Sequence, residues 1–379
     1  MRAYQMCTRC VMDTTAEEIT FDAQGVCSFC HYFDREVKPI LDRARSGEGR
    51  KVLERIVEAI KRSGQGKPYD SVLGISGGTD SSYLAYLAKQ LGLRPLVVHV
   101  DTGWNTPESE RNVKSLVSRL GFDLEIIRVD WEEMRDLQIA FYKASVKNCE
   151  IPQDHAFLAA LYKKAAEIGV HYILTGGNFA TESILPRSWG FNAADLRHIL
   201  AIQRRFGTRP LRKFPTMSFW ERYVYYPFIR QIREVRPLNY VPYNRAEAKR
   251  ILMEQFGWRD YGLKHYESVL TRFYQGYYLP TKFGIDKRKA HFSSLILSGQ
   301  MTREEALEEL KKPPYPSDEL LQKDKAYIAE RLGLSLEEWE EILALPPRRH
   351  EEFPNSAWLF ALKERIVGLS GIRRRRYGL

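Results

Sequence analysis

Residues 71–82 read Ser71-Val-Leu-Gly-Ile-Ser-Gly-Gly-Thr-Asp-Ser-Ser82, an apolar run followed by two glycines and several hydroxyl side chains. The apolar run predicts a buried strand, which passes through a tight turn into the start of a helix. Glycines let the backbone approach an anion closely, and a helix start presents free N–H groups and the positive end of its dipole. This combination predicts a binding site for a chain of phosphates.

The spacing of these glycines differs from two common nucleotide motifs. A dinucleotide site requires G-x-G-x-x-G, and a P-loop requires a lysine after its last glycine, which is absent here. On both sides of the turn, strands alternate with helices: we expect strands over 71–75, 95–101, 124–129 and 171–175, and helices over 81–91, 107–120 and 154–168. The pattern predicts an α/β fold with a Rossmann-type parallel sheet, whose ligand loops (76–82, 101–105 and 175–178) follow the strands' carboxyl ends.

The hexapeptide Ser76-Gly-Gly-Thr-Asp-Ser81 resembles the signature of the PP-loop ATP pyrophosphatases, an adenine nucleotide alpha-hydrolase-like superfamily that cleaves ATP between its α- and β-phosphates. The resemblance implies ATP and Mg²⁺ as cofactors, with Asp80 near the magnesium or the phosphates. Arg236-Pro-Leu238 resembles a late segment of the same family. The residues that the resemblance assigns to the nucleotide are Ser76, Gly77, Gly78, Thr79, Asp80, Ser81, Ser82, Asp101, Gly176, Gly177 and Asn178.

Over most of its first 310 residues, the chain is similar to the N-acetyl sugar amidotransferases of bacterial surface-polysaccharide biosynthesis. The matching segments are Cys7-Thr-Arg-Cys10, 74–82, 150–155, 264–268 and 283–291. The resemblance implies that the N-acetyl group of a nucleotide-linked sugar acid becomes an acetamidino group, in the synthesis of lipopolysaccharide O-antigen or a related glycan. An unactivated amide does not exchange its oxygen for ammonia, so ATP must first adenylate that oxygen to an imidate.

The source of ammonia is a separate question. Glutaminases generally use a nucleophilic cysteine, but this sequence has no cysteine at its very N-terminus, and Cys149 lacks the flanking glycines of a nucleophile elbow. Cys149 is better interpreted as a small buried residue. A separate glutaminase is therefore expected. The family resemblance implies a glutaminase and a barrel-like ammonia conduit similar to the two subunits of imidazole-glycerol-phosphate synthase.

Four of the five cysteines, Cys7, Cys10, Cys27 and Cys30, form a Cys-x2-Cys-x16-Cys-x2-Cys pattern. This spacing is typical of a tetrahedral Zn²⁺ site, with an iron–sulfur cluster as the alternative. Four thiolates close the coordination shell, so a structural role is expected.

Other polar residues are candidates with structural alternatives. Asn178 and Glu182 can share a helical face that holds magnesium or simply faces solvent. Asp154 is predicted to cap a helix, with His155 as a possible acid or base. A last group lies where the amidotransferase resemblance is dense and is expected to hold a phosphate or the sugar acid: Lys264, His265, Glu267, Asp286, Lys287, Arg288 and His291.

We expect four regions: a zinc knuckle (1–34), a helical connector (35–66), the ATP-binding domain (67–258) and a mainly helical C-terminal region (259–379). A well-delimited helix is predicted over 244–256, between a capping Asn244 and Gly257. No membrane span or secretory signal is evident, which favours the cytoplasm.

The net charge of +10 is concentrated in residues 201–250, which hold twelve Lys or Arg residues against three acidic ones. A basic surface suits a sugar nucleotide, a partner protein or nucleic acid. The main alternative function is therefore a tRNA-modifying sulfur transferase, also a PP-loop enzyme. Those enzymes typically need further cysteines near the nucleotide, and only Cys149 is spare here, so nucleic acid is not favoured. A zinc-dependent scaffold that binds ATP only as a regulator explains the intact hexapeptide least well.

Overall fold

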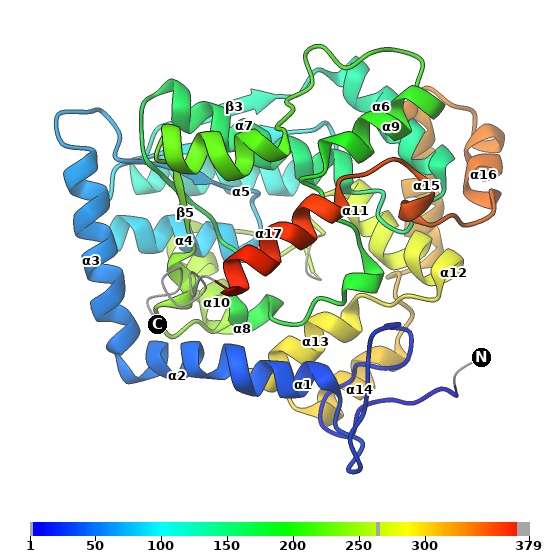
Figure 1. Ribbon diagram of the computed structural model, residues 1–379, viewed down its shortest axis with the longest axis horizontal. Coiled ribbons are helices and arrows are strands. Elements are labelled where there is room, and N and C mark those ends of the chain that lie inside the picture. Colours follow the sequence, from blue (N-terminus) through cyan, green and yellow to red (C-terminus); the bar gives the residue numbers. More distant parts are fainter. Residues whose placement is uncertain (1–2, 263–265, 370–379) are drawn as a thin grey trace.

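A five-stranded parallel sheet forms the centre of the computed structural model, which describes residues 3–262 and 266–369 (Figure 1). Its strands are β1 (Ser71–Gly74), β2 (Pro95–Asp101), β3 (Leu124–Arg128), β4 (Tyr172–Leu174) and β5 (Arg233–Val235), in the order β3-β2-β1-β4-β5. All four pairings are parallel, and β1 pairs with both β2 and β4. The strand order therefore reverses at β1, the position at which ligands bind in open α/β sheets.

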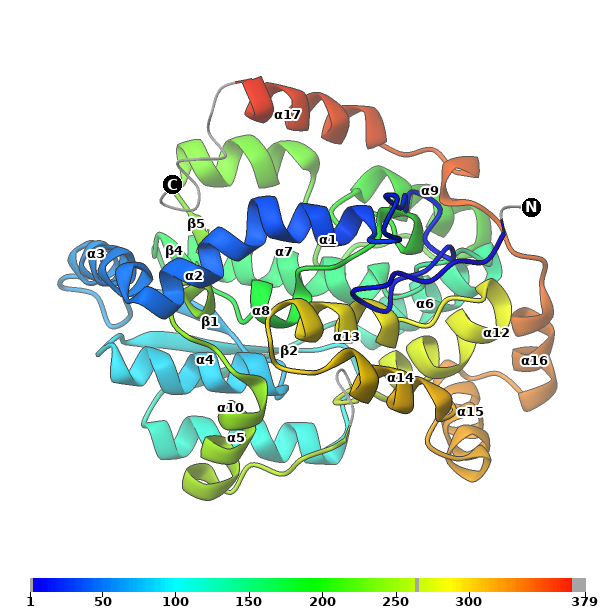
Figure 2. The same cartoon turned by 90° about the horizontal axis from the view of Figure 1, so that it is seen from below.

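Helices cover both faces of the sheet (Figure 2). One face is covered by α4 (Thr79–Gln90), α5 (Pro107–Leu120) and α10 (Arg245–Phe256), and α7 (Ile151–Glu167) packs against β1, β2 and β4 on the other face. Next to α7, α6 (Trp131–Ala144) packs on α9 (Leu196–Phe206). Because both faces are covered, β1 and β2 consist almost entirely of buried residues.

The predicted elements agree closely with those observed in this sheet. The strand over 95–101 and the helix over 107–120 have the predicted bounds, and α10 begins after an Asn244 cap and ends at Gly257. Two elements, α6 and β5, were not predicted. The predicted helix over 154–168 begins earlier, at Ile151, with Pro152 in its first turn, where its missing N–H costs no hydrogen bond. Asp154 is therefore not a helix cap, and that prediction is wrong.

The N-terminal region consists of a knuckle followed by a helical arm. The arm contains α1 (Ser28–Tyr32), η1 (Phe33–Val37), α2 (Lys38–Ser46) and α3 (Glu48–Ser63). The break between α2 and α3 lies at Gly47, whose φ of 84° ends α2 in the left-handed region that glycine adopts without strain.

The C-terminal region is mainly helical, as predicted. Its elements are α11 (Val269–Phe273), η5 (Tyr274–Tyr278), α12 (Leu279–Phe283), α13 (Arg288–Leu297), α14 (Arg303–Lys311), α15 (Asp318–Leu332), α16 (Leu336–Ala344), η6 (His350–Glu352) and α17 (Ala357–Leu369). Short segments that precede it are α8 (Phe179–Glu182), η2 (Arg187–Trp189), η3 (Glu221–Ile229) and η4 (Pro237–Asn239).

One continuous core joins the four predicted regions. It includes Leu41 of the arm, Val72 of β1, Leu252 of α10 and Trp339 of α16. The regions therefore share their packing, and their boundaries remain predictions. None of the helices in the described parts of the chain is long and apolar enough to cross a membrane.

Candidate active site

The turn between β1 and α4 is built around Gly77. Its φ is 87°, and an added Cβ would lie 2.6 Å from Ser109 Oγ and 2.8 Å from the Ser109 carbonyl oxygen. The Ser109 hydroxyl donates to the Ser76 carbonyl (2.9 Å), and the Trp258 indole N–H donates to the Gly77 carbonyl (3.1 Å). Glycine at this position lets α5 pack directly under the turn, which fixes the turn from below.

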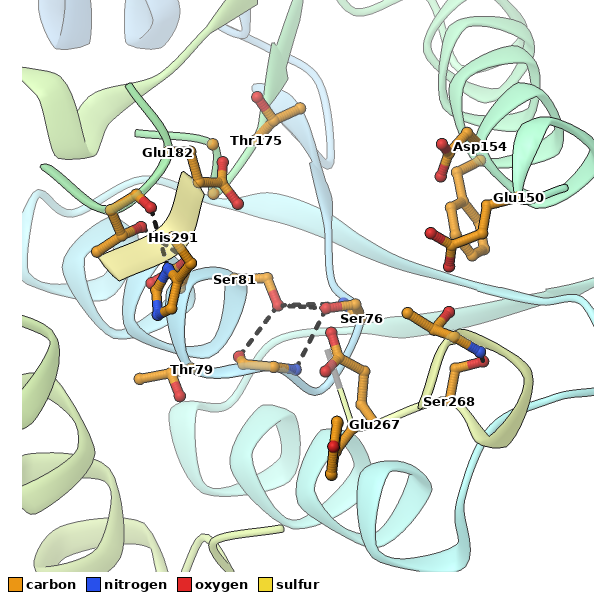
Figure 3. A pocket seen from close by; sticks show the side chains of 18 of the residues that line it. Ser76, Thr79, Ser81, Glu150, Asp154, Thr175, Glu182, Glu267, Ser268 and His291 are labelled. Atoms are coloured by element: carbon orange, nitrogen blue, oxygen red, sulfur yellow. Dashed lines mark hydrogen bonds between the residues drawn. The ribbon is translucent and has the colours of Figure 1, made fainter. Parts of the chain in front are cut away.

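Hydroxyl groups hold the upper side of the turn (Figure 3). The Ser81 hydroxyl accepts from the Ser76 backbone N–H (3.1 Å) and donates to the Gly78 carbonyl (3.2 Å). The Gly78 N–H donates to Ser76 Oγ (3.2 Å). A second glycine contact comes from the loop after β4, because a Cβ on Gly176 would lie 2.8 Å from the Ser81 backbone nitrogen. Two Gly-rich loops, predicted separately from the sequence, thus meet.

A cavity of about 730 Å³ opens above the turn, at the carboxyl ends of β1, β2 and β4. Five predicted residues of the turn line it, and so do three of the loop after β4: Ser76, Gly78, Thr79, Asp80, Ser81, Gly176, Gly177 and Asn178. The Thr79 and Ser82 hydroxyls are buried and have no hydrogen-bond partner among the described residues. Thr79 lines the cavity, so its hydroxyl is available to an acceptor such as a phosphate oxygen.

Asp80 lies in the first turn of α4, where its carboxylate accepts hydrogen bonds from the Tyr243 hydroxyl and from Thr181 Oγ1 (3.4 Å). Burial and the Asp80 charge raise the pKa of Tyr243, so its hydroxyl stays protonated and keeps donating. Asp80 is thus held at the cavity by α8 and by the segment before α10.

The four N-terminal cysteines come together as predicted. Their sulfur atoms all lie within 4.8 Å of one another, with Cys7–Cys30 at 3.8 Å and Cys10–Cys27 at 3.7 Å. A tetrahedral site with Zn–S bonds of about 2.3 Å separates its sulfurs by about 3.8 Å, so the cluster fits zinc. The backbone N–H groups of Arg9 and Met12 point at two of the sulfurs, each at 3.4 Å, and support thiolates there.

Two family comparisons match separate parts of the chain. Residues 70–168 match the phosphoadenosine phosphosulfate reductase domain, and residues 267–366 match the family described as "LPS biosynthesis protein WbpG-like, C-terminal domain". The chain is a WbpG-like protein of the PP-loop superfamily.

Similarity to individual proteins covers different shares of the chain. An uncharacterized protein of Methanocaldococcus jannaschii is 24% identical over 82% of this chain and 95% of its own length. A tRNA(Ile)-lysidine synthase of Chlamydia pneumoniae is 27% identical over 40% of this chain and 46% of its own. An NH(3)-dependent NAD(+) synthetase of Pyrococcus horikoshii is 28% identical over 45% and 69%.

Carboxylates form the wall opposite the PP-loop. Glu150, the N-cap residue of α7, and Asp154, in the first turn of that helix, face the cavity. Glu182 and Glu267 lie nearer the turn between β1 and α4 (Figure 3). The sequence singled out Glu182 and Glu267 and missed Glu150. Gln153, 3% exposed, also lines the cavity, and within the part of the chain that the structure describes its Nε2 has no hydrogen-bond partner. This wall therefore offers acceptors and one free donor to a polar ligand.

Cations lie on other parts of the cavity lining, which includes Arg236 of the predicted R-P-L segment, Arg245, Lys287 and Arg288. Arg236 and Arg222 both pair with Glu234, at 3.1 and 2.8 Å, and these cations lower the pKa of that carboxyl although its burial opposes them. Arg288 is held by Asp286 (2.7 Å), so Asp286 orients this arginine. His291 of α13 lines the same wall and bonds to the Thr181 carbonyl (3.2 Å).

Two predicted site residues, Asp101 and Asn178, have roles in the structure that differ from expectation. Asp101 is not among the lining residues, and it accepts from the Gly103 N–H (2.8 Å) to shape its own loop. Asn178 lines the cavity, but its carbonyl oxygen caps α8 by accepting from the Thr181 N–H (2.9 Å), which weakens its case as a magnesium ligand. Lys264 and His265 lie outside the described residues.

His155 is the clearest correction. It is fully buried on the core side of α7, Nδ1 donates to the Ala193 carbonyl (2.7 Å), and Nε2 accepts from the Met217 N–H (3.0 Å). Both nitrogens are occupied and the ring does not line the cavity, so it supports the fold rather than acid/base chemistry.

We expect His155 to make the fold acid-sensitive. Burial lowers its pKa to about 4, so between pH 6.5 and 4 the unfolded chain binds more protons than the folded one. The contribution of neutral His155 to the free energy of unfolding is fully present above pH 6.5. It falls by roughly 3 kcal/mol as the pH drops through this window. Thermal melts of His155→Gln should show a weaker pH dependence over that window than the wild type. The exposed His31→Gln is the control, and equal slopes for all three proteins would contradict this role.

Proposed function

We propose that this protein is an ATP-dependent amidotransferase that converts the N-acetyl group of a nucleotide-linked sugar acid into an acetamidino group in surface-glycan biosynthesis. One observation carries the proposal: a single cavity joins the PP-loop to a wall of carboxylates and an unpartnered amide. It offers a place for a second polar substrate beside the nucleotide. The WbpG-like C-terminal match to an LPS biosynthesis family supports the substrate class, and the ammonia-dependent relative supports the nitrogen donor.

The nucleotide fits the end of the cavity at β1 and β2. The Ser76, Gly78, Thr79 and Ser81 groups surround the position of the leaving pyrophosphate, and Mg²⁺ bound with ATP would neutralise part of its charge. Val98, Val100, Phe157 and Leu161 form an apolar lining suited to a purine ring.

The chemical steps then follow from the substrates. The acetamido oxygen attacks the α-phosphorus, the bond from that phosphorus to the bridging oxygen breaks, and pyrophosphate leaves. Ammonia adds to the imidate carbon and AMP departs with the former amide oxygen, which leaves the amidine. Positioning and charge neutralisation account for most of this catalysis. The carboxylates of Glu150 and Asp154 are placed to accept the proton that ammonia loses.

The environment of Cys149 disfavours the sulfur-transferase alternative. Cys149 is 1% exposed, contacts the Val146 carbonyl (3.4 Å), and burial raises the pKa of its thiol to about 12. A persulfide carrier requires a reactive thiolate. The described residues that line the cavity include no cysteine.

ATP–pyrophosphate exchange tests the reaction class. We expect exchange to be stimulated by nucleotide-linked acetamido sugar acids and not by bulk tRNA. Stimulation by tRNA alone would replace the proposal with the sulfur-transferase function.

The ammonia source gives a second prediction. The purified chain should form amidine from ammonium salts but not from glutamine, because its fifth cysteine is buried and a separate glutaminase with an ammonia-conducting subunit is required. Amidine is measured by the mass of the product. Efficient use of glutamine by the isolated chain would contradict a separate glutaminase.

A further inference from the structure

Exposed apolar side chains gather on two segments, η3 and α17. Trp220 and Phe228, at the two ends of η3, are 62% and 73% exposed. On α17, Trp358, Leu362 and Ile366 are 61%, 47% and 55% exposed. These three are spaced four residues apart, so they form one stripe along the helix. Figure 2 shows α17 at the periphery of the molecule, next to the segment of η3.

The opposite side of α17 is anchored. Phe360 is 8% exposed and packs edge-on against Phe219, with ring centroids 5.2 Å apart. Lys363 lies over the Tyr223 ring at 4.3 Å. These contacts hold the helix on η3 with its apolar stripe toward solvent. A stripe of this size on a fixed helix is typical of an interaction surface.

A groove of about 300 Å³ lies between α9, residues 218–220 just before η3, and the first turn of α17. Leu200, Trp220 and Leu359 contribute apolar surface to it, and Arg197 and Arg204 lie on the α9 side. Both arginines are exposed and are spaced seven residues apart, so they share a face of α9. The groove therefore combines apolar anchor sites with positive charge.

The charge and shape indicate the kind of partner. Arg365 of α17 is also exposed and adds positive charge, whereas Arg187, whose side chain is 83% exposed, is paired with Glu364 of the same helix. A second copy would bring the same cations face to face, which opposes self-association through this surface. A concave groove suits an inserted protein segment better than a flat lipid surface. The partner should thus present apolar side chains flanked by carboxylates.

The surface extends to the catalytic cavity. Leu185 lines the cavity and is 68% exposed, so it lies on the rim. Two residues later, Arg187 pairs with Glu364 of α17 at 3.6 Å. A protein docked on α17 would therefore lie near the cavity opening.

We propose that the α17 surface, formed by Arg197, Arg204, Trp220, Trp358, Leu362 and Ile366, docks the acidic face of the subunit that supplies ammonia. This inference rests on the proposed amidotransferase function. It assigns the delivery of ammonia to the side of the cavity that Leu185 borders.

Leu362→Glu and Leu336→Glu form a matched pair for the test, because both leucines are 47% exposed. Leu336 is the first residue of α16, where glutamate suits the helix dipole. Each variant is assayed in two reactions. The first contains ammonium; the second contains glutamine labelled with 15N at its amide, together with a cell extract of the source organism from which this protein has been deleted. We expect Leu362→Glu to lose about tenfold in the glutamine reaction and to keep the ammonium rate. Leu336→Glu should keep both, and equal glutamine rates for the two variants would overturn the docking site.

Photo-crosslinking in cells separates this inference from the amidotransferase proposal. A benzophenone amino acid is placed at position 362 or 336, and the adduct is identified by mass spectrometry. An adduct with a glutamine-hydrolysing or ammonia-conducting protein at 362 alone supports docking, even if the sugar substrate is wrong. The docking proposal is overturned if the adduct contains a second copy of this chain or lipid, if position 336 is labelled equally, or if no adduct forms. If the wild-type protein forms no amidine from ammonium with any acetamido sugar acid, the proposed amidotransferase function is rejected instead.

Discussion

Gly77→Ala is expected to lower ATP–pyrophosphate exchange by at least about a hundredfold, because it displaces the backbone that surrounds the phosphates. The native φ of 87° is unfavourable for alanine by about 1–2 kcal/mol. The new methyl group would also lie 2.6 Å from Ser109 Oγ and 2.8 Å from the Ser109 backbone oxygen, which cannot move without α5. Overpacking of this kind adds about 1–3 kcal/mol. The turn must shift, and its N–H groups shift with it.

Gly47→Ala separates the clash from the backbone strain. Gly47 has a φ of 84°, but apart from its own chain neighbours no heavy atom of the described residues lies within 4 Å of an added Cβ. This variant should lose about 1–2 kcal/mol of stability and keep full exchange activity. Circular dichroism and thermal melts establish whether Gly77→Ala remains folded before its exchange rate is compared. A folded Gly77→Ala with wild-type exchange would show that this turn does not position the phosphates.

The sequence allowed the centre of the site to be predicted because that centre is contiguous. The signature of residues 76–81 contains its own turn, its own hydroxyls and the start of its own helix. Two Gly-rich loops could be placed together because parallel strands bring their carboxyl ends to one edge. This reasoning places only the loops that directly follow strands; it does not place side chains on helices or on other segments.

The cavity wall could not be predicted in the same way. Glu150 and Asp154 reach the cavity because α7 begins at Ile151, and Pro152 was the available signal for that earlier start. Adjacent residues on a helix point about 100° apart. The same helix therefore directs Asp154 to the cavity and His155 to the core, and a sequence motif that contains both does not distinguish them.

Contacts from distant segments also determine the turn. Tyr261 accepts a hydrogen bond from the Thr79 N–H (3.2 Å), and burial together with the Glu267 charge raises the pKa of Tyr261 and keeps it protonated. His99 donates from Nδ1 to the Ile75 carbonyl (2.9 Å) and receives a hydrogen bond from Asn105 (3.0 Å). These contacts depend on the tertiary fold, and neither tyrosine nor histidine at those positions carries a local signal.

Removal of the knuckle metal should disturb the cavity as well as the N-terminus. Two contacts join the knuckle to α13: Lys289 pairs with the buried Asp13, and the Val11 N–H donates to Ser293 Oγ (3.2 Å). A third joins it to α14, where Arg303 donates to the Cys7 and Cys10 carbonyls (3.0 and 3.1 Å). Because α13 also carries Arg288 and His291 into the cavity lining, loosening it should weaken substrate binding.

We therefore expect Cys10→Ser to lose the metal-binding capacity of the knuckle, to melt about 5 °C lower, and to show a raised KM for the proposed sugar substrate. Metal content is measured by atomic absorption, and the same shifts should follow chelation of the wild type. Cys149→Ala is the matched control, because this cysteine is also buried but does not belong to the cluster. The variant should retain its metal and its KM and lose only about 1 kcal/mol of stability. If Cys10→Ser lost its metal yet kept both melting temperature and KM, the knuckle would not support α13. If instead the melting temperature fell while KM stayed constant, the knuckle would stabilise the chain without positioning the cavity wall.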